Sequence, residues 1–163
     1  MSLAITLLAA VFLPLFPFSA VFTALYQRAG HAAVRVGLLL AWPQIGLILA
    51  GRLPGPVPDS VIALALATAV LYALRALALR ELGQWIAFLA TSLWTLLWLV
   101  GPGEAAAIPT HWHALGMSAP LALLALLTAS LERRFGAAYT GLYAGLAQTL
   151  PRLAGVLVVA VLA

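Results

Sequence analysis

Side chains that bind transition metals come closest together in the stretch His111-Trp112-His113. Two histidines one residue apart bind zinc or copper when further ligands converge on the ion, and Glu104 upstream is the obvious third ligand. Such pairs are also common in loops, and a tryptophan between them suits the edge of a membrane. We therefore keep Glu104, His111 and His113 as candidate ligands but expect no metal site and no bound cofactor.

The sequence contains no motif for the other common kinds of catalysis or cofactor binding. The absence of cysteine excludes disulfides, iron–sulfur clusters and thiolate metal sites. Asp59 is the only aspartate, which excludes proteolysis by an aspartate pair. No nucleophile elbow, phosphate loop or dinucleotide fingerprint occurs. His31 and His111 belong to loops on opposite faces of the expected topology, so a haem held between two histidines is not expected. We expect no catalytic activity of the chain's own.

Composition predicts an integral membrane protein. Of the 163 residues, 65% are apolar and 7% are charged, whereas soluble domains carry roughly 25% charged residues. The apolar runs do not alternate with polar residues, so they predict helices, and residues 1–163 form one all-α transmembrane domain. The net charge of +4 does not indicate nucleic acid binding, because the arginines stand singly or in pairs at the ends of apolar runs.

The apolar runs predict about six membrane spans, since about 20 apolar residues cross a bilayer as a helix. The expected spans are residues 3–26, 36–50, 60–79, 84–100, 114–131 and a last one that runs to 163. The apolar run after Arg152 is too short to cross alone. The last helix therefore either begins near Gly141 or stops within the membrane against a partner.

Prolines mark the irregular places in these spans. Pro14 and Pro17 break the first span in its middle, which lipid tolerates only where protein covers the freed carbonyls. Pro43 predicts a kink whose freed carbonyl the Gln44 side chain satisfies, and Pro151 restarts the last helix. We expect all five positions to serve packing within the bundle or against a partner.

The arginines set the expected orientation. Only Arg52 lies in an even-numbered loop. By the positive-inside rule the odd-numbered loops are cytoplasmic, which places both termini outside a bacterial cytoplasmic membrane. Arg75 is expected to extend from inside the third span to the lipid headgroups; a role on an ion path would need a nearby acid, for which Glu81 is the candidate. The odd-numbered loops hold Arg28, Arg35, Arg75, Arg80, Arg133, Arg134 and Arg152.

The C-terminal part of the chain carries a family resemblance. Residues 113–163 resemble the middle of the antiporter-like membrane subunits of respiratory complex I, Mrp-type cation/proton antiporters and DAB-type inorganic carbon uptake complexes. A less extensive similarity covers the N-terminal run at Leu13, Pro14 and Phe18. The C-terminal matches are Glu132 and Arg133 in a turn, Gly145 and Leu146, and Leu150, Pro151, Leu153 and Ala154 in the restarted helix.

The chain differs from the family in the polar residues of its spans, and these differences determine which function we expect. The family carries a row of Lys, Glu and His at the membrane centre, whereas this chain has no lysine and its span centres offer only Gln44, Thr91, Ser92 and Thr95 as notable polar side chains. The resemblance implies a proton-path role for His113 alone. We therefore expect an accessory subunit of a hetero-oligomeric, ion-gradient-coupled complex, packed against a larger membrane subunit that carries the proton or cation path.

Two other functions remain open at this point. The chain is an independent small transporter or channel if copies of it form a pore lined by Gln44 and residues 91–95. Alternatively, it is the membrane anchor of a redox complex, in which Trp94, Trp98 and the histidines would serve a quinone or a metal. In each case lipid surrounds the spans and nucleic acid is not a partner.

Overall fold

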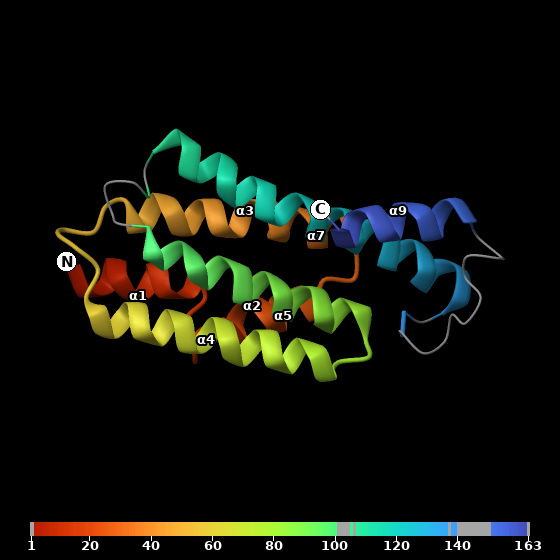
Figure 1. Ribbon diagram of the computed structural model, residues 1–163, viewed down its shortest axis with the longest axis horizontal. Coiled ribbons are helices and arrows are strands. Elements are labelled where there is room, and N and C mark those ends of the chain that lie inside the picture. Colours follow the sequence, from red (N-terminus) through yellow and green to blue (C-terminus); the bar gives the residue numbers. More distant parts are fainter. Residues whose placement is uncertain (1, 101–104, 106, 137, 140–150, 163) are drawn as a thin grey trace.

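The computed structural model describes residues 2–100, 105, 107–136, 138–139 and 151–162. The described chain is helical apart from turns, loops and one isolated β-bridge between Glu81 and Tyr139 (Figure 1). The helices are α1 (Ser2–Phe12), α2 (Ser19–Arg28), α3 (Ala32–Ala50), α4 (Asp59–Ala78), α5 (Leu82–Thr95), the 3-10 helix η1 (Leu96–Leu99), α7 (Ile108–Phe135) and α9 (Pro151–Leu162).

Within the residues that the structure describes, four helical stretches are long and apolar enough to cross a membrane: Ala32–Ala50, Asp59–Ala78, Leu82–Leu99 and Ile108–Phe135. The all-helical membrane class expected from composition is confirmed, whereas six spans are not. The first apolar run is divided between two short helices, α1 and α2. The 12 residues of α9 cover roughly half of a bilayer's hydrocarbon core. Residues 141–150, where the last helix was expected to begin, lie outside the described residues.

Two helices are longer than the sequence predicts. Helix α3 begins at Ala32 rather than at residue 36, and it continues through Pro43. Helix α7 runs from Ile108 to Phe135, so both the histidine stretch and the Leu-Glu-Arg-Arg stretch are helical rather than in loops. Pro109 suits the first turn, where its missing N–H would have no helical partner. Gly136 ends α7 in the left-handed region (φ +79°), with its N–H bonded to the Glu132 carbonyl at 2.9 Å.

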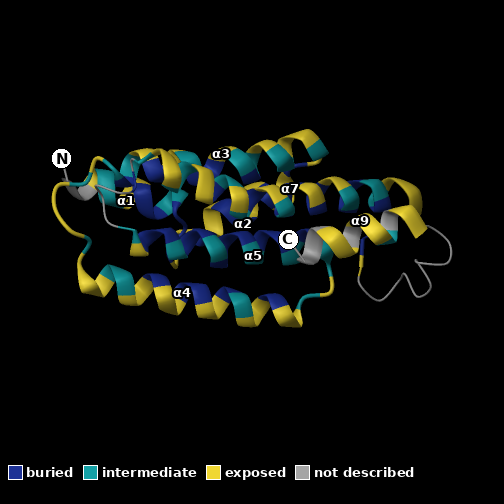
Figure 2. Ribbon diagram, turned by 45° about the horizontal axis from the view of Figure 1, so that its top comes forward, coloured by how far each residue is buried: buried dark blue, intermediate teal, exposed yellow. Residues whose placement is uncertain are grey.

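The long helices form antiparallel pairs. Helix α3 packs against α7, and α4 packs against α5, while α1 lies on α3 and α2 lies on α5. The first apolar run therefore packs against both helix pairs: α1, before the break, lies on the α3–α7 pair, and α2, after it, lies on the α4–α5 pair (Figure 1). Figure 2 shows buried residues where α5 and α7 face the centre and exposed residues along the outer edge of α4.

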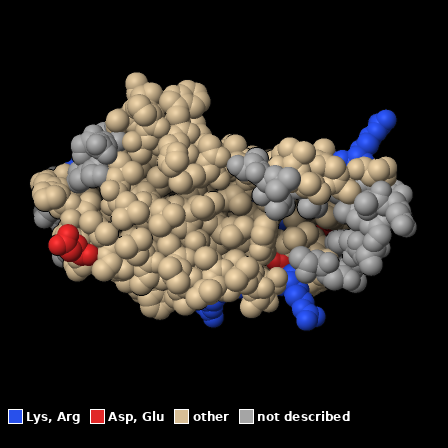
Figure 3. All heavy atoms as spheres, in the orientation of Figure 1, with Lys and Arg blue, Asp and Glu red and all other residues tan. Residues whose placement is uncertain are grey.

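The loops alternate between the two ends of the bundle. The α2–α3 turn, the α4–α5 turn and the C-terminal end of α7 lie together at one end, which we call the arginine-rich end (Figure 1). The N-terminus, the α3–α4 loop and the start of α7 lie at the other end. Charged side chains on the visible face keep to the ends and the lower edge, and a broad uncharged middle separates them (Figure 3). This pattern suits helices whose middle parts lie in lipid.

Gly46 brings α3 into close contact with the end of α1. A Cβ atom at Gly46 would lie 2.7 Å from Leu13 Cγ and 3.0 Å from the Phe12 carbonyl carbon. Leu13 is fully buried, and its neighbour Phe12 packs against Trp42 with tilted rings whose centroids are 4.7 Å apart. Only glycine therefore lets α3 pass the start of the helix break this closely.

We expect Gly46→Ala to lower the free energy of unfolding by about 1–3 kcal/mol, because the added methyl group overpacks a filled site. Gly37→Ala is the matched control on the same helix, since a Cβ there meets no atom within 4 Å. Thermal unfolding of the two purified variants in detergent measures the difference. Equal stability of both variants would show that the Gly46 contact does not constrain the bundle.

Candidate functional site

The two histidines of the stretch His111–His113 point in different directions on α7. His111 points into the bundle, where its Nδ1 lies 2.6 Å from Gln44 Oε1, whereas Trp112 and His113 are exposed. Residues two apart on a helix face different directions, so the two imidazoles diverge. No group of three His, Cys, Asp or Glu side chains is placed to hold a metal ion within the described residues. Glu104, the expected third ligand, lies outside them.

Gln44 has a different role from the one expected. Its side chain does not satisfy the carbonyl freed by Pro43 but reaches across to α7. Gln44 Nε2 donates to the His111 carbonyl at 3.2 Å, and its Oε1 faces His111 Nδ1. With the amide in this orientation, His111 Nδ1 is the donor. The pair thus links the middle of α3 to the first turns of α7, and the sequence offered no signal for this pairing.

Side chains from three other helical segments form hydrogen bonds with backbone groups at the helix break around Pro14 and Pro17. Trp98 Nε1 donates to the Leu13 carbonyl at 2.9 Å, and Trp42 Nε1 donates to the Val11 carbonyl at 3.2 Å. The Phe16 N–H donates to Thr68 Oγ1 at 3.2 Å. Discontinuous membrane helices often use freed carbonyls to bind cations. Here the Val11 and Leu13 carbonyls each accept an indole N–H group, so protein donors satisfy the break.

Polar side chains within the spans are likewise paired. Thr91 Oγ1 donates to the Ala87 carbonyl at 2.9 Å, and Thr95 bonds to carbonyls one turn back on the same helix. Ser92 donates to the Ala69 carbonyl of α4, which ties α5 to α4. Ser118 accepts the indole N–H of Trp94 at 3.0 Å. Ser92 and Ser118 therefore link neighbouring helices, whereas Thr91 and Thr95 bond within their own helix.

An ion pair lies at the arginine-rich end. Arg35 Nη1 is 3.1 Å from both carboxylate oxygens of Glu132, and Arg35 Nε donates to the Ala29 carbonyl at 2.9 Å. The guanidinium also lies over the Tyr26 ring, 5.8 Å from its centroid. The side chains of Arg35 and Glu132 are 15% and 33% exposed. The pair joins the first turn of α3 to the last turn of α7, so Arg35 is more than a loop cation that sets orientation.

The remaining arginines are exposed where the structure describes them. Arg75 is exposed, as expected of a side chain that extends to the headgroups, and its guanidinium carbon lies 6.0 Å from the centroid of the Phe88 ring. Arg133 bonds only within α7, through contacts of 3.4 Å to the Ala129 carbonyl and to Ser130 Oγ. The other exposed arginines are Arg28, Arg52, Arg80, Arg134 and Arg152.

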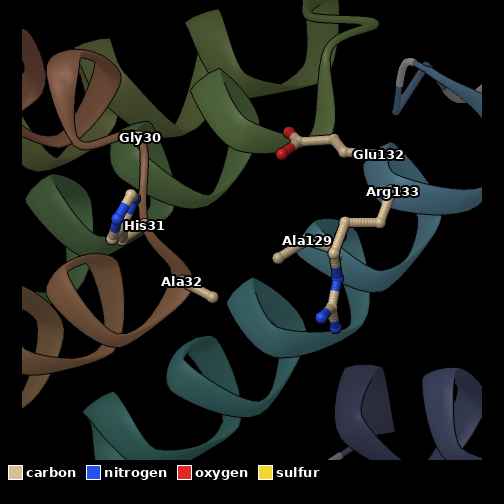
Figure 4. A pocket seen from close by; sticks show the side chains of 6 residues that line it. All are labelled: Gly30, His31, Ala32, Ala129, Glu132 and Arg133. Carbon is tan, nitrogen blue, oxygen red and sulfur yellow. Dashed lines mark hydrogen bonds between the residues drawn. The ribbon is translucent and has the colours of Figure 1, made fainter.

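A hollow of about 410 Å³ opens beside the ion pair (Figure 4). In Figure 4 the Glu132 carboxylate, the Arg133 side chain and the His31 ring surround it from different sides. Its lining combines three ionisable side chains with one glycine and two alanines. The lining residues are Gly30, His31 and Ala32 at the start of α3 and Ala129, Glu132 and Arg133 at the end of α7.

Comparison with known proteins adds no relative: no protein-family model, no curated protein and no solved structure matches this chain. The function has to be inferred from the chain's own residues. The described contacts favour a packed scaffold with one polar hollow at its arginine-rich end.

We expect the Arg35 and Glu132 side chains to be energetically coupled by about 1–2 kcal/mol, between the values typical of exposed and of buried pairs. The measurement is a double-mutant cycle on unfolding stability with Arg35→Gln, Glu132→Gln and the double variant. The control cycle combines Arg133→Gln with Glu132→Gln and should show coupling near zero. Equal coupling in the two cycles would contradict a specific Arg35–Glu132 pair.

Proposed function

We propose that the chain is an accessory membrane subunit of a multi-subunit, ion-gradient-coupled complex, similar to complex I, Mrp and DAB-type assemblies. In this role it packs against a larger subunit that carries the proton or cation path. The observation that carries the proposal is the chemistry of the interior. In the described chain, every buried serine and threonine is hydrogen-bonded, and the one buried side-chain polar atom without a partner is the Tyr26 hydroxyl oxygen. The buried serines and threonines are Ser19, Thr23, Thr68, Thr91, Ser92, Thr95, Ser118 and Thr128.

Ion translocation requires more than hydroxyl groups. Transporters and pumps hold ionisable side chains near the membrane centre, because these groups carry the ion or the proton. The described ion pair, Arg35 with Glu132, lies at one end of the bundle, and its two charges neutralise each other. His111, the one histidine that points inward, is bonded to Gln44 and so serves packing. A chain built this way supports a pathway in a neighbour better than a pathway of its own.

The outer surface offers a place for such a neighbour. Helix α4 exposes Val70, Leu74 and Leu77, which are 59%, 61% and 82% exposed and share one side of the helix. Ala63 and Ala67 are exposed on the same side. Small residues let a neighbouring helix approach closely, which matters because lipid provides no hydrophobic drive for association. Lipid covers whatever part of this face a subunit does not.

The family resemblance gives the proposal its direction. Glu132 and Arg133, which match the family's turn, lie at the arginine-rich end, and Pro151 is the first described residue of α9. Gly145, Leu146 and Leu150 lie outside the described residues. We place the arginine-rich end in the cytoplasm and both termini outside, following the positive-inside rule. A proton path that used the exposed His113 would run between α7 and a partner, not through this bundle.

The proposal predicts that a larger membrane subunit co-purifies with the tagged chain in a fixed ratio. The experiment is purification from native membranes in a mild detergent, followed by mass spectrometry of the associated proteins. An unrelated tagged membrane protein of similar size, purified in parallel, controls for non-specific carry-over. Recovery of a homogeneous chain without any stoichiometric partner would overturn the accessory role and favour an independent transporter or channel.

A further inference from the structure

The hollow at the arginine-rich end has an electrostatic character that the ion pair determines. Both oxygens of the Glu132 carboxylate are bonded to Arg35, so this acid contributes little free negative charge to the hollow. Arg133 lines the same hollow, and its hydrogen bonds to other described residues are two 3.4 Å contacts within its own helix. A guanidinium has five N–H donors, so most of those on Arg133 are available to a ligand. The free charge that faces the hollow is therefore positive.

Two further features of the hollow favour an anion. It is lined by Gly30, His31 and Ala32 at the start of α3, a helix of 19 residues. The first N–H groups of a helix lack helical partners and carry a partial positive charge. The His31 ring adds a hydrogen-bond donor from the same segment. These groups add partial positive charge to the hollow, whereas Arg133 contributes a whole positive charge.

The position of the hollow indicates where the anion comes from. It lies among the helix ends at the arginine-rich end, at the level that lipid headgroups occupy around a membrane helix. An apolar groove of about 420 Å³ begins in the first turn of α3, at Val34, and follows that helix past Gly37 and Ala41 to Ile45. Ala32 and Val34 point to different sides of α3, about 200° apart around the helix, but the groove starts within one turn of the hollow. A headgroup held in the hollow therefore has apolar surface of α3 close by for its acyl chains.

We propose that this hollow binds the phosphate group of an anionic phospholipid, with Arg133 as the principal ligand. Arg133 and His31 donate hydrogen bonds to the phosphate oxygens, and Arg35 keeps Glu132 from repelling them. The acyl chains follow the apolar surface of α3. The site is independent of the proposed accessory role, because every residue it needs belongs to this chain.

The test compares two adjacent arginines. Native mass spectrometry of the purified chain, from micelles with equal amounts of phosphatidylglycerol and phosphatidylcholine, should show preferential retention of phosphatidylglycerol. We expect Arg133→Gln to reduce this retention about fivefold, since one basic residue near an anionic headgroup contributes about that factor. Arg134→Gln is the matched control, because Arg134 is exposed but does not line the hollow, and it should retain the lipid like the unmodified chain.

Three results would overturn the proposal. Equal losses in both variants would mean that the arginines act as diffuse surface charge. Retention unchanged in Arg133→Gln would mean that the hollow does not hold the headgroup. Inorganic phosphate that displaces the lipid at the concentration at which it binds alone would assign the site to a free anion. Identical elution and melting of the two variants ensures that misfolding does not account for a difference.

Discussion

The fold depends on a requirement that lipid imposes on backbone carbonyls. A proline within a membrane helix removes an N–H donor, and no water is present in the hydrocarbon core to replace it. Between α1 and α2 this happens at Pro14 and Pro17, beside the Val11 and Leu13 carbonyls. Trp42 and Trp98 supply the missing donors through their indole N–H groups. Helix α3 and η1 lie beside the break, where the indole of Trp42 reaches the Val11 carbonyl and the indole of Trp98 reaches the Leu13 carbonyl.

The tryptophan rings that satisfy this requirement also pack in the centre of the bundle. Phe22 on α2 packs between the rings of Trp42 and Trp94, with centroid distances of 5.4 and 4.7 Å. Trp94 is bonded in turn to Ser118 on α7. The rings that donate to backbone and hydroxyl groups therefore also pack in the core of the described bundle. Charge is confined to the helix ends, where the Arg35–Glu132 pair fixes α3 to α7 and leaves Arg133 to face the adjoining hollow.

The sequence predicts those parts of this structure that depend on local composition. Apolar runs predict the helical membrane class, and the helix break lies where Pro14 and Pro17 predict it. The boundaries of α7 were missed because the histidine and arginine stretches look like loop composition, whereas Pro109 and Gly136 set the ends. Contacts between distant segments could not be predicted. Arg35 and Glu132 are 97 positions apart, and Gln44 and His111 are 67 apart, so no spacing pattern reveals either pair.

The most direct test of this account is the unfolding stability of Trp98→Phe. The substitution keeps an aromatic ring but leaves the buried Leu13 carbonyl without its donor, so the free energy of unfolding should fall by about 1–3 kcal/mol. Trp112→Phe removes an indole N–H from a side chain that is 67% exposed and should change stability by less than about 0.5 kcal/mol. Equal effects of the two substitutions would contradict the claim that protein donors in the bundle hold the helix break closed.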